Sequence, residues 1–168
     1  FTKNVKKAPY LLGRFLGAYV FSAGLMLAIG AGLAFGAAVV HVLDPTQLTT
    51  HRTSAYLWPF VVGVWPTLFF AGALFFSLAA LSRGMAPVYV GMVVLVLGYT
   101  VLTSALGDVQ NQELGALLDP FGLLTFDVVT RYWTPVERNA QLVPPTGHLL
   151  GNRLLWCVAG AALLGLAI

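Results

Sequence analysis

Four long apolar segments limit what this chain can fold into more than any other feature. They lie at about residues 13–42, 58–81, 87–105 and 147–168. About 20 consecutive apolar residues let a helix cross the roughly 30 Å hydrocarbon core of a bilayer, and backbone groups in that core must bond within the helix itself. Only 9% of the residues are charged, against about 25% in a soluble domain. The sequence therefore predicts an all-α polytopic membrane protein with four transmembrane helices.

One stretch, residues 107–146, interrupts this apolar pattern between the third and fourth segments. It holds five of the six acidic residues: Asp108, Glu113, Asp119, Asp127 and Glu137. Asp119-Pro120 is typical of a helix start, and Thr134 with Glu137 forms a capping-box pattern. We expect short interfacial helices near 111–118, 120–132 and 135–141.

The charges predict an orientation in the membrane. Five basic residues fall on one side with no acid: Lys3, Lys6, Lys7, Arg14 and Arg83. Cytoplasmic loops carry an excess of lysine and arginine, so we place residues 1–12, a basic amphipathic elbow, in the cytoplasm. The 107–146 stretch then lies outside the cytoplasm.

Small residues recur every four positions in the first span, at Gly24, Ala28, Gly32 and Gly36. This spacing lets two helix backbones approach closely in a membrane. We interpret it as a helix-packing face, and a substrate-lining face is compatible with the same residues.

Two further patterns concern helix ends and bends. Pro66 lies inside the second span and predicts a kink, because proline removes one backbone hydrogen bond. Ser82-Arg83-Gly84 ends that span, with Gly84 expected in the left-handed cap conformation. Pro87 then begins the third span, so the two spans form a tight hairpin.

Asn152-Arg153 is the most suggestive polar pair, since it lies about one turn into the final span. An arginine at that depth is costly unless it is paired or reaches the interface. Two interpretations stay open: an arginine that snorkels to headgroups, or a lock that holds the outer stretch on the bundle, with Glu137 and Asp119 as candidate partners.

Several kinds of site are not indicated. No nucleotide-binding loop, zinc-binding helix or nucleophile motif occurs, and the three histidines match no metal-ligand spacing. We therefore expect no catalytic, cofactor-binding or metal-binding residue in this segment. The formal net charge of +3 reflects membrane topology, and we expect no nucleic-acid partner.

Three sequence motifs carry a family resemblance: LLDPFG (117–122), TRYWTPVERN (130–139) and LLGNRLLW (149–156). Together they resemble the permease region of type-2 ABC exporters, in particular bacterial membrane proteins that fuse such a permease to a zinc aminopeptidase-like domain. The opening APYLLGRFLGAY (8–19) is similar to the cytoplasmic segment that precedes a span in these permeases, with Arg14 where lysine is usual.

The resemblance implies a six-span permease half of which this chain holds the last four spans, so we expect a longer protein. It implies a bacterial inner membrane, a second permease half or homodimer, and a cytoplasmic ATP-binding subunit that carries the ATP. The implied ATPase-coupling surface is Lys3, Lys6, Lys7, Pro9 and Arg14, and the implied outer gate or lock is Asp119, Pro120, Trp133, Glu137, Asn152 and Arg153. The expected function is ATP-driven export by alternating access. The alternative is a non-transporting membrane anchor or scaffold for a peptidase domain.

Overall fold

The computed structural model describes residues 6–44, 52–106, 111–145 and 147–168, and in these residues it is all-α. Four helical segments are long and apolar enough to cross a membrane, which confirms the predicted polytopic membrane fold. The spans are α1 (Lys7–Leu43), the run of α2 (Thr53–Pro59), η1 (Phe60–Val64) and α3 (Trp65–Ser82), then α4 (Ala86–Leu106) and α8 (His148–Ala167). Three short helices lie between the last two spans: α5 (Gln112–Leu118), α6 (Leu123–Val129) and α7 (Pro135–Ala140).

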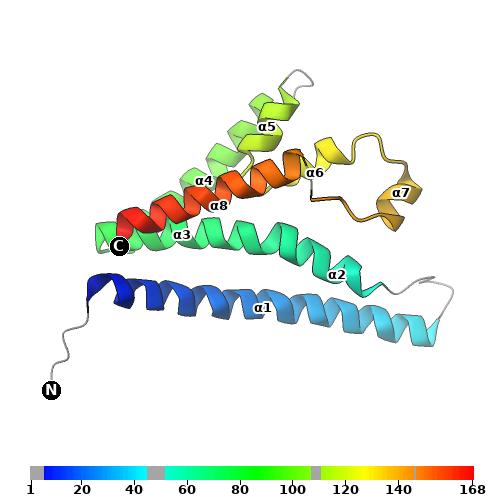
Figure 1. Ribbon diagram of the computed structural model, residues 1–168, viewed down its shortest axis with the longest axis horizontal. Helices are drawn as coiled ribbons and strands as arrows, with labels where there is room; N and C mark the ends of the chain where they lie inside the picture. Colours follow the sequence, from blue (N-terminus) through cyan, green and yellow to red (C-terminus); the bar gives the residue numbers. More distant parts are fainter. Residues whose placement is uncertain (1–5, 45–51, 107–110, 146) are drawn as a thin grey trace.

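Helix α3 lies at the centre of the bundle, with α1 along one side and α8 along another (Figure 1). Helix α4 packs mainly against α3 and α5, and none of its residues is buried. The bundle therefore has one tightly joined pair, α3 with α8, and two outer spans with large exposed apolar surfaces.

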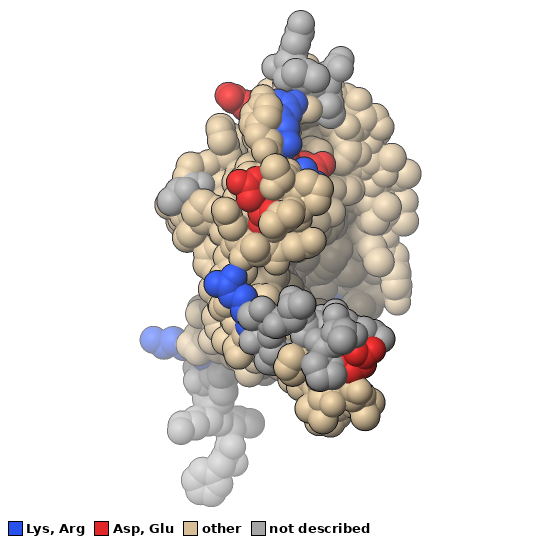
Figure 2. Space-filling view, turned by 90° about the vertical axis from the view of Figure 1, so that its right-hand side faces the viewer, with Lys and Arg blue, Asp and Glu red and all other residues tan. Residues whose placement is uncertain are grey.

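The two ends of the bundle differ in charge. The start of α1, the α3–α4 turn and the end of α8 lie together, and the Lys7 Nζ lies 3.5 Å from the Ala167 carbonyl oxygen. The opposite end holds α5, α6 and α7, where Figure 2 shows acidic and basic side chains on the same face. The predicted separation of a lysine end from a carboxylate end holds for the described residues, while the orientation in a membrane stays a prediction.

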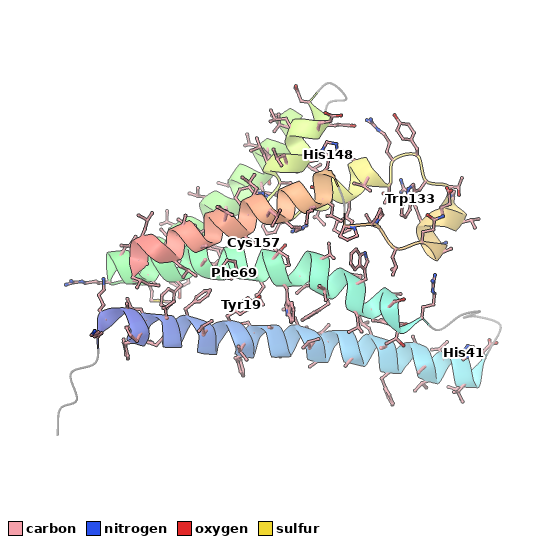
Figure 3. All side chains as sticks on the ribbon, in the orientation of Figure 1. Tyr19, His41, Phe69, Trp133, His148 and Cys157 are labelled. Atoms are coloured by element: carbon pink, nitrogen blue, oxygen red, sulfur yellow. The ribbon has the colours of Figure 1, made fainter. Side chains whose placement is uncertain are left out.

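An aromatic cluster joins α1 to α3. Phe15 is 4% exposed and lies 5.5 Å, ring centre to ring centre, from Phe76, and Tyr19 lies 6.0 Å from Phe69. Figure 3 shows Tyr19 and Phe69 facing one another between the two helices. Leu164 of α8 completes this core. All these contacts lie in the half of α1 that begins at the lysines.

The small-residue stripe of α1 points away from this core. Position 24 is nine residues beyond Phe15, or about 180° around the helix at 100° per residue. A Cβ added at Gly24, Gly32 or Gly36 would meet nothing within 4 Å, and Ala28 is exposed. The stripe packs against no helix of the described residues, so its packing role stays a prediction.

The boundaries of the first span differ from expectation. We predicted an amphipathic elbow over residues 1–12 and a span from about residue 13; α1 begins at Lys7 and continues without a break into the span. Pro9 causes no break because it lies in the first turn, where backbone N–H groups have no partner within the helix. Residues 1–5, including Lys3, lie outside the described residues.

The second span bends through a wide turn rather than a simple kink. Residues Phe60–Val64 form a π-helical turn, in which the Trp65 N–H donates to the Phe60 carbonyl. Pro66 follows at the second position of α3. Because Pro66 has no N–H to donate, the regular α-helical bonding pattern cannot continue through it. The predicted distortion is present, and it lies just before the proline.

At the end of α3, the left-handed residue is Arg83 and not Gly84. Arg83 has a φ of 53°, and the Ser82 hydroxyl donates to the Leu78 carbonyl. A non-glycine residue in this conformation costs about 1–2 kcal/mol. Arg83 is exposed, so its side chain meets no packing obstacle there.

The α3–α8 contact depends on a glycine. A Cβ at Gly160 would lie 3.0 Å from the Phe69 ring and 3.3 Å from the Phe70 Cα. Gly160→Leu should therefore force the helices apart and lower the free energy of unfolding in detergent by about 1–3 kcal/mol. Gly165→Leu on the same helix is the control, since a Cβ at Gly165 meets nothing within 4 Å. Equal stability of the two variants would contradict this account of the helix pair.

Candidate functional site

The candidate site lies where the short helices α5 and α6 meet α8. It includes the polar turn that joins α5 to α6. We call residues 111–145, which contain α5, α6 and α7, the cap. The Asp119 carboxylate is fully buried and accepts hydrogen bonds from the backbone N–H groups of Phe121 (2.8 Å) and Leu124 (2.7 Å). Asp119 thus fixes the backbone that leads into α6.

The predicted start of α6 at Pro120 is wrong by three residues. The helix begins at Leu123, and Gly122 at its N-cap has a φ of 75°. Asp119 still bonds an amide of the first turn, as expected of a capping carboxylate. It does so from across a tight turn that only a glycine enters at low cost.

Asn152 fastens the end of α5 to α8. Its side chain is fully buried, and its Nδ2 lies 2.8 Å from the Ala116 carbonyl oxygen, 3.0 Å from that of Leu117 and 2.8 Å from that of Asp119. The last carbonyl groups of a helix receive no hydrogen bond from an N–H of the same helix. The amide of Asn152 therefore supplies the donors that the C-terminal end of α5 lacks.

Arg153 holds the following turn. Its side chain is 6% exposed, its Nη2 donates to the Phe121 carbonyl (2.8 Å), and its Nη1 donates to the Thr67 hydroxyl of α3 (3.1 Å). The negative charge of Asp119 also attracts the guanidinium. Arg153 therefore binds the cap and α3 at once and does not snorkel to the surface.

The contact leaves two buried polar atoms unused. Asn152 Oδ1 and Arg153 Nε have no hydrogen-bond partner among the described residues. A buried polar group without a partner costs about 1–3 kcal/mol. The attachment of the cap is therefore specific in geometry but is not the strongest that these side chains can form.

Gly122 makes room for the guanidinium. A Cβ at this position would lie 1.5 Å from Arg153 Nη2. The glycine of the DPFG sequence thus serves two purposes, a left-handed backbone and direct contact with a buried charge.

The other predicted lock residues divide into two groups. Pro120 is buried beside Asp119 and belongs to the turn. Glu137 instead forms the predicted capping box, where its carboxylate accepts from the Thr134 N–H (2.7 Å) and hydroxyl (2.8 Å). Trp133 lies before α7 (Figure 3), and neither Trp133 nor Glu137 is a partner of Asn152 or Arg153.

Sequence reasoning missed three residues of the site. Thr67 binds Arg153, Trp156 donates from Nε1 to the Leu117 carbonyl (3.3 Å), and the Thr125 hydroxyl donates to the Ala116 carbonyl. The available signals were a lone threonine directly after Pro66 and a tryptophan one helical turn beyond Asn152-Arg153. The aromatic ring of Trp156 also stacks edge-on against Phe70 at 4.5 Å.

The predicted coupling residues lie at the other end of the bundle. Lys6, Pro9 and Arg14 are exposed, and the Arg14 guanidinium lies 5.7 Å from the Tyr10 ring centre. Lys7 contacts the end of α8. These residues share one end of α1, but the site around Arg153 does not include them.

Within the part of the chain that the structure describes, no three histidine, cysteine, aspartate or glutamate residues gather as a metal site. Comparison with protein-family models, curated proteins and solved structures gives no match for this chain. The site is thus defined by its own geometry: a buried amide and a buried guanidinium of an apolar helix bind backbone carbonyls of the cap.

The Gly122–Arg153 contact predicts strong coupling between two substitutions. Gly122→Ala should cost about 3–5 kcal/mol of unfolding free energy, because it displaces a buried charge from its hydrogen-bond partners. In an Arg153→Leu background, the same substitution should cost only the backbone strain of about 1–2 kcal/mol. A double-mutant cycle of unfolding in detergent measures the difference. Additive effects would show that the alanine does not act through Arg153.

The capping box of α7 predicts a local pH dependence. Hydrogen bonds from Thr134 lower the pKa of Glu137 below its ordinary value near 4.5. The stabilisation of α7 is therefore complete above that value and is lost as the pH falls through the lower folded pKa. The hydrogen-exchange protection of residues 136–140 should fall in this range. In Thr134→Val, which loses the hydroxyl bond but keeps the backbone N–H bond, the Glu137 pKa should rise part of the way toward its ordinary value. An identical titration in both proteins would contradict the capping role.

Proposed function

We propose that this chain is part of the membrane-embedded permease of an ATP-driven exporter of a bacterial inner membrane. Substrate would move by alternating access, in which one end of the bundle opens as the other closes. The observation that carries the proposal is the polar attachment of the cap to α8 by Asn152 and Arg153. An outer closure that rests on a few directional hydrogen bonds suits a gate, because hydrogen bonds in one network strengthen one another and the closed state is then well defined.

Helix α1 supplies a means of coupling the two ends. It runs unbroken over 37 residues, or about 55 Å at 1.5 Å per residue. Its exposed basic start lies at the end opposite the cap, and its contacts with α3 gather in the half near that start. A force on the lysines would therefore reach α3 through the Phe15–Phe76 cluster, and would reach α2 and η1 through the further contacts of α1.

The partners in this proposal follow from what the chain offers. ATP would bind on a separate cytoplasmic subunit or domain that meets Lys3, Lys6, Lys7, Pro9 and Arg14. A second permease half or a second copy of the chain would cover exposed apolar surface. The outward stripe of Gly24, Ala28, Gly32 and Gly36 and the unburied helix α4 are the surfaces that support such a partner.

A second candidate is a membrane anchor that positions a peptidase domain without transport. The same outward stripe favours it, because small residues join membrane helices whatever the complex does. An anchor needs no movement between cap and α8. A disulfide that fixes the cap to α8 would thus block transport by a permease and leave a peptidase anchor unaffected.

Charge reversal at the start of α1 tests the permease proposal. Lys3→Glu, Lys6→Glu and Lys7→Glu together should reduce transport per ATP hydrolysed by about tenfold or more, since like charges across an interface cost several kcal/mol. Both rates are measured on the complex purified from its own membrane. Arg83→Glu, at the same end but on the α3–α4 turn, is the control. An unchanged ratio, or a complex that hydrolyses no ATP, would favour the anchor.

A further inference from the structure

A separate cavity of about 350 Å³ lies in the cap, on the side of α6 that faces the outer end of α4. Its walls combine an apolar part with charged and polar side chains. The lining residues are Leu106, Gln112, Leu124, Asp127, Val128, Arg131 and Arg138. Asn152 and Arg153 take no part in it, so this cavity is distinct from the attachment of the cap.

Two guanidinium groups line the cavity with most of their donors unused. Arg131 donates one hydrogen bond, to the Gln112 side chain, and Arg138 donates one, to the Thr130 carbonyl (3.0 Å). A guanidinium has five N–H donors and binds phosphate or carboxylate oxygens in pairs. The two arginines therefore provide a binding surface for an oxyanion.

Asp127 adds the opposite charge to the same cavity. It is exposed and lies on α6 one turn before Arg131. A carboxylate repels a ligand that is only anionic and attracts an ammonium group. The cavity thus favours a ligand that carries both an oxyanion and an amine. The spacing of these two groups in the ligand must match the spacing of the arginines and Asp127.

The position of the cavity implies that the ligand also has an apolar part. Leu106 is the last residue of a membrane-spanning helix, and Leu124 and Val128 lie on the adjacent face of α6. The end of a span meets the headgroup region of a bilayer. A ligand here has its charged groups in the cavity and its apolar part beside α4.

We propose that this cavity binds the headgroup of a zwitterionic phospholipid, with the phosphate on Arg131 and Arg138 and the amine on Asp127. The acyl chains then lie along α4 from Leu106 into the bilayer. This site is independent of any ATPase partner and of transport. A bound lipid would link the outer end of α4 to the cap.

The test is lipid binding by the full chain in detergent, measured by native mass spectrometry. The probes are dihexanoyl phosphatidylethanolamine, dihexanoyl phosphatidylglycerol, which lacks the amine, and glycerophosphoethanolamine, which lacks the acyl chains. We expect the first to bind more tightly than either of the others. Equal or tighter binding of phosphatidylglycerol would overturn the role of Asp127, and equal binding of glycerophosphoethanolamine would identify a free soluble ligand instead of a lipid.

Variants locate the site. Arg131→Gln with Arg138→Gln should weaken phosphatidylethanolamine binding by about tenfold or more, because charge-assisted hydrogen bonds are lost. Asp127→Asn should weaken binding of phosphatidylethanolamine but not of phosphatidylglycerol. Arg52→Gln is the matched control, since Arg52 also binds one backbone carbonyl of the cap, that of Ala140, but lines the neighbouring cavity. Unchanged binding by the double variant, with unfolding temperatures matched to the control, would overturn the proposal.

Discussion

The structure depends on one constraint: a charge that is buried in a membrane span needs partners from the protein. Arg153 is the charge, and its partners are a carbonyl of the cap and a hydroxyl of α3. The cap has the complementary need, because α5 ends on carbonyls that its own helix cannot satisfy. Asn152 fills that need from the adjacent position on α8. Each element thus supplies what the other lacks, and neither would be stable alone in an apolar setting.

Sequence reasoning found the elements, the polar pair and one partner, Asp119, whose backbone carbonyl oxygen lies 2.8 Å from Asn152 Nδ2, but not the other partners. The spans follow from the length of apolar runs, and the capping box of α7 follows from Thr134 and Glu137 directly. Asn152-Arg153 stood out because charge is rare in a span. The expected partner Glu137 was wrong, because Arg153 and Asn152 bind backbone carbonyls. Every residue has a carbonyl, so the sequence holds no mark of which ones a side chain will reach.

Other differences have a similar cause. Which face of α1 meets α3 is decided by the fit of Phe15 and Tyr19 against other rings, and the regular spacing of Gly24 to Gly36 says nothing of which neighbour is present. The left-handed residue at the end of α3 is Arg83, whereas glycine propensity favoured Gly84. Local sequence patterns therefore predicted the helices well, but they predicted poorly which helix faces pack against one another.

The wide turn of η1 has a consequence for the register of the second span. A π turn accommodates one residue more than an α turn, so the side chains of α2 are rotated by about 100° from where an uninterrupted helix would carry them. Arg52, just before α2, reaches the Ala140 carbonyl at the end of α7 with a bond of 2.6 Å. Straightening of the turn would swing this arginine off α7. A change in the helical winding of the second span would therefore also change the position of α7.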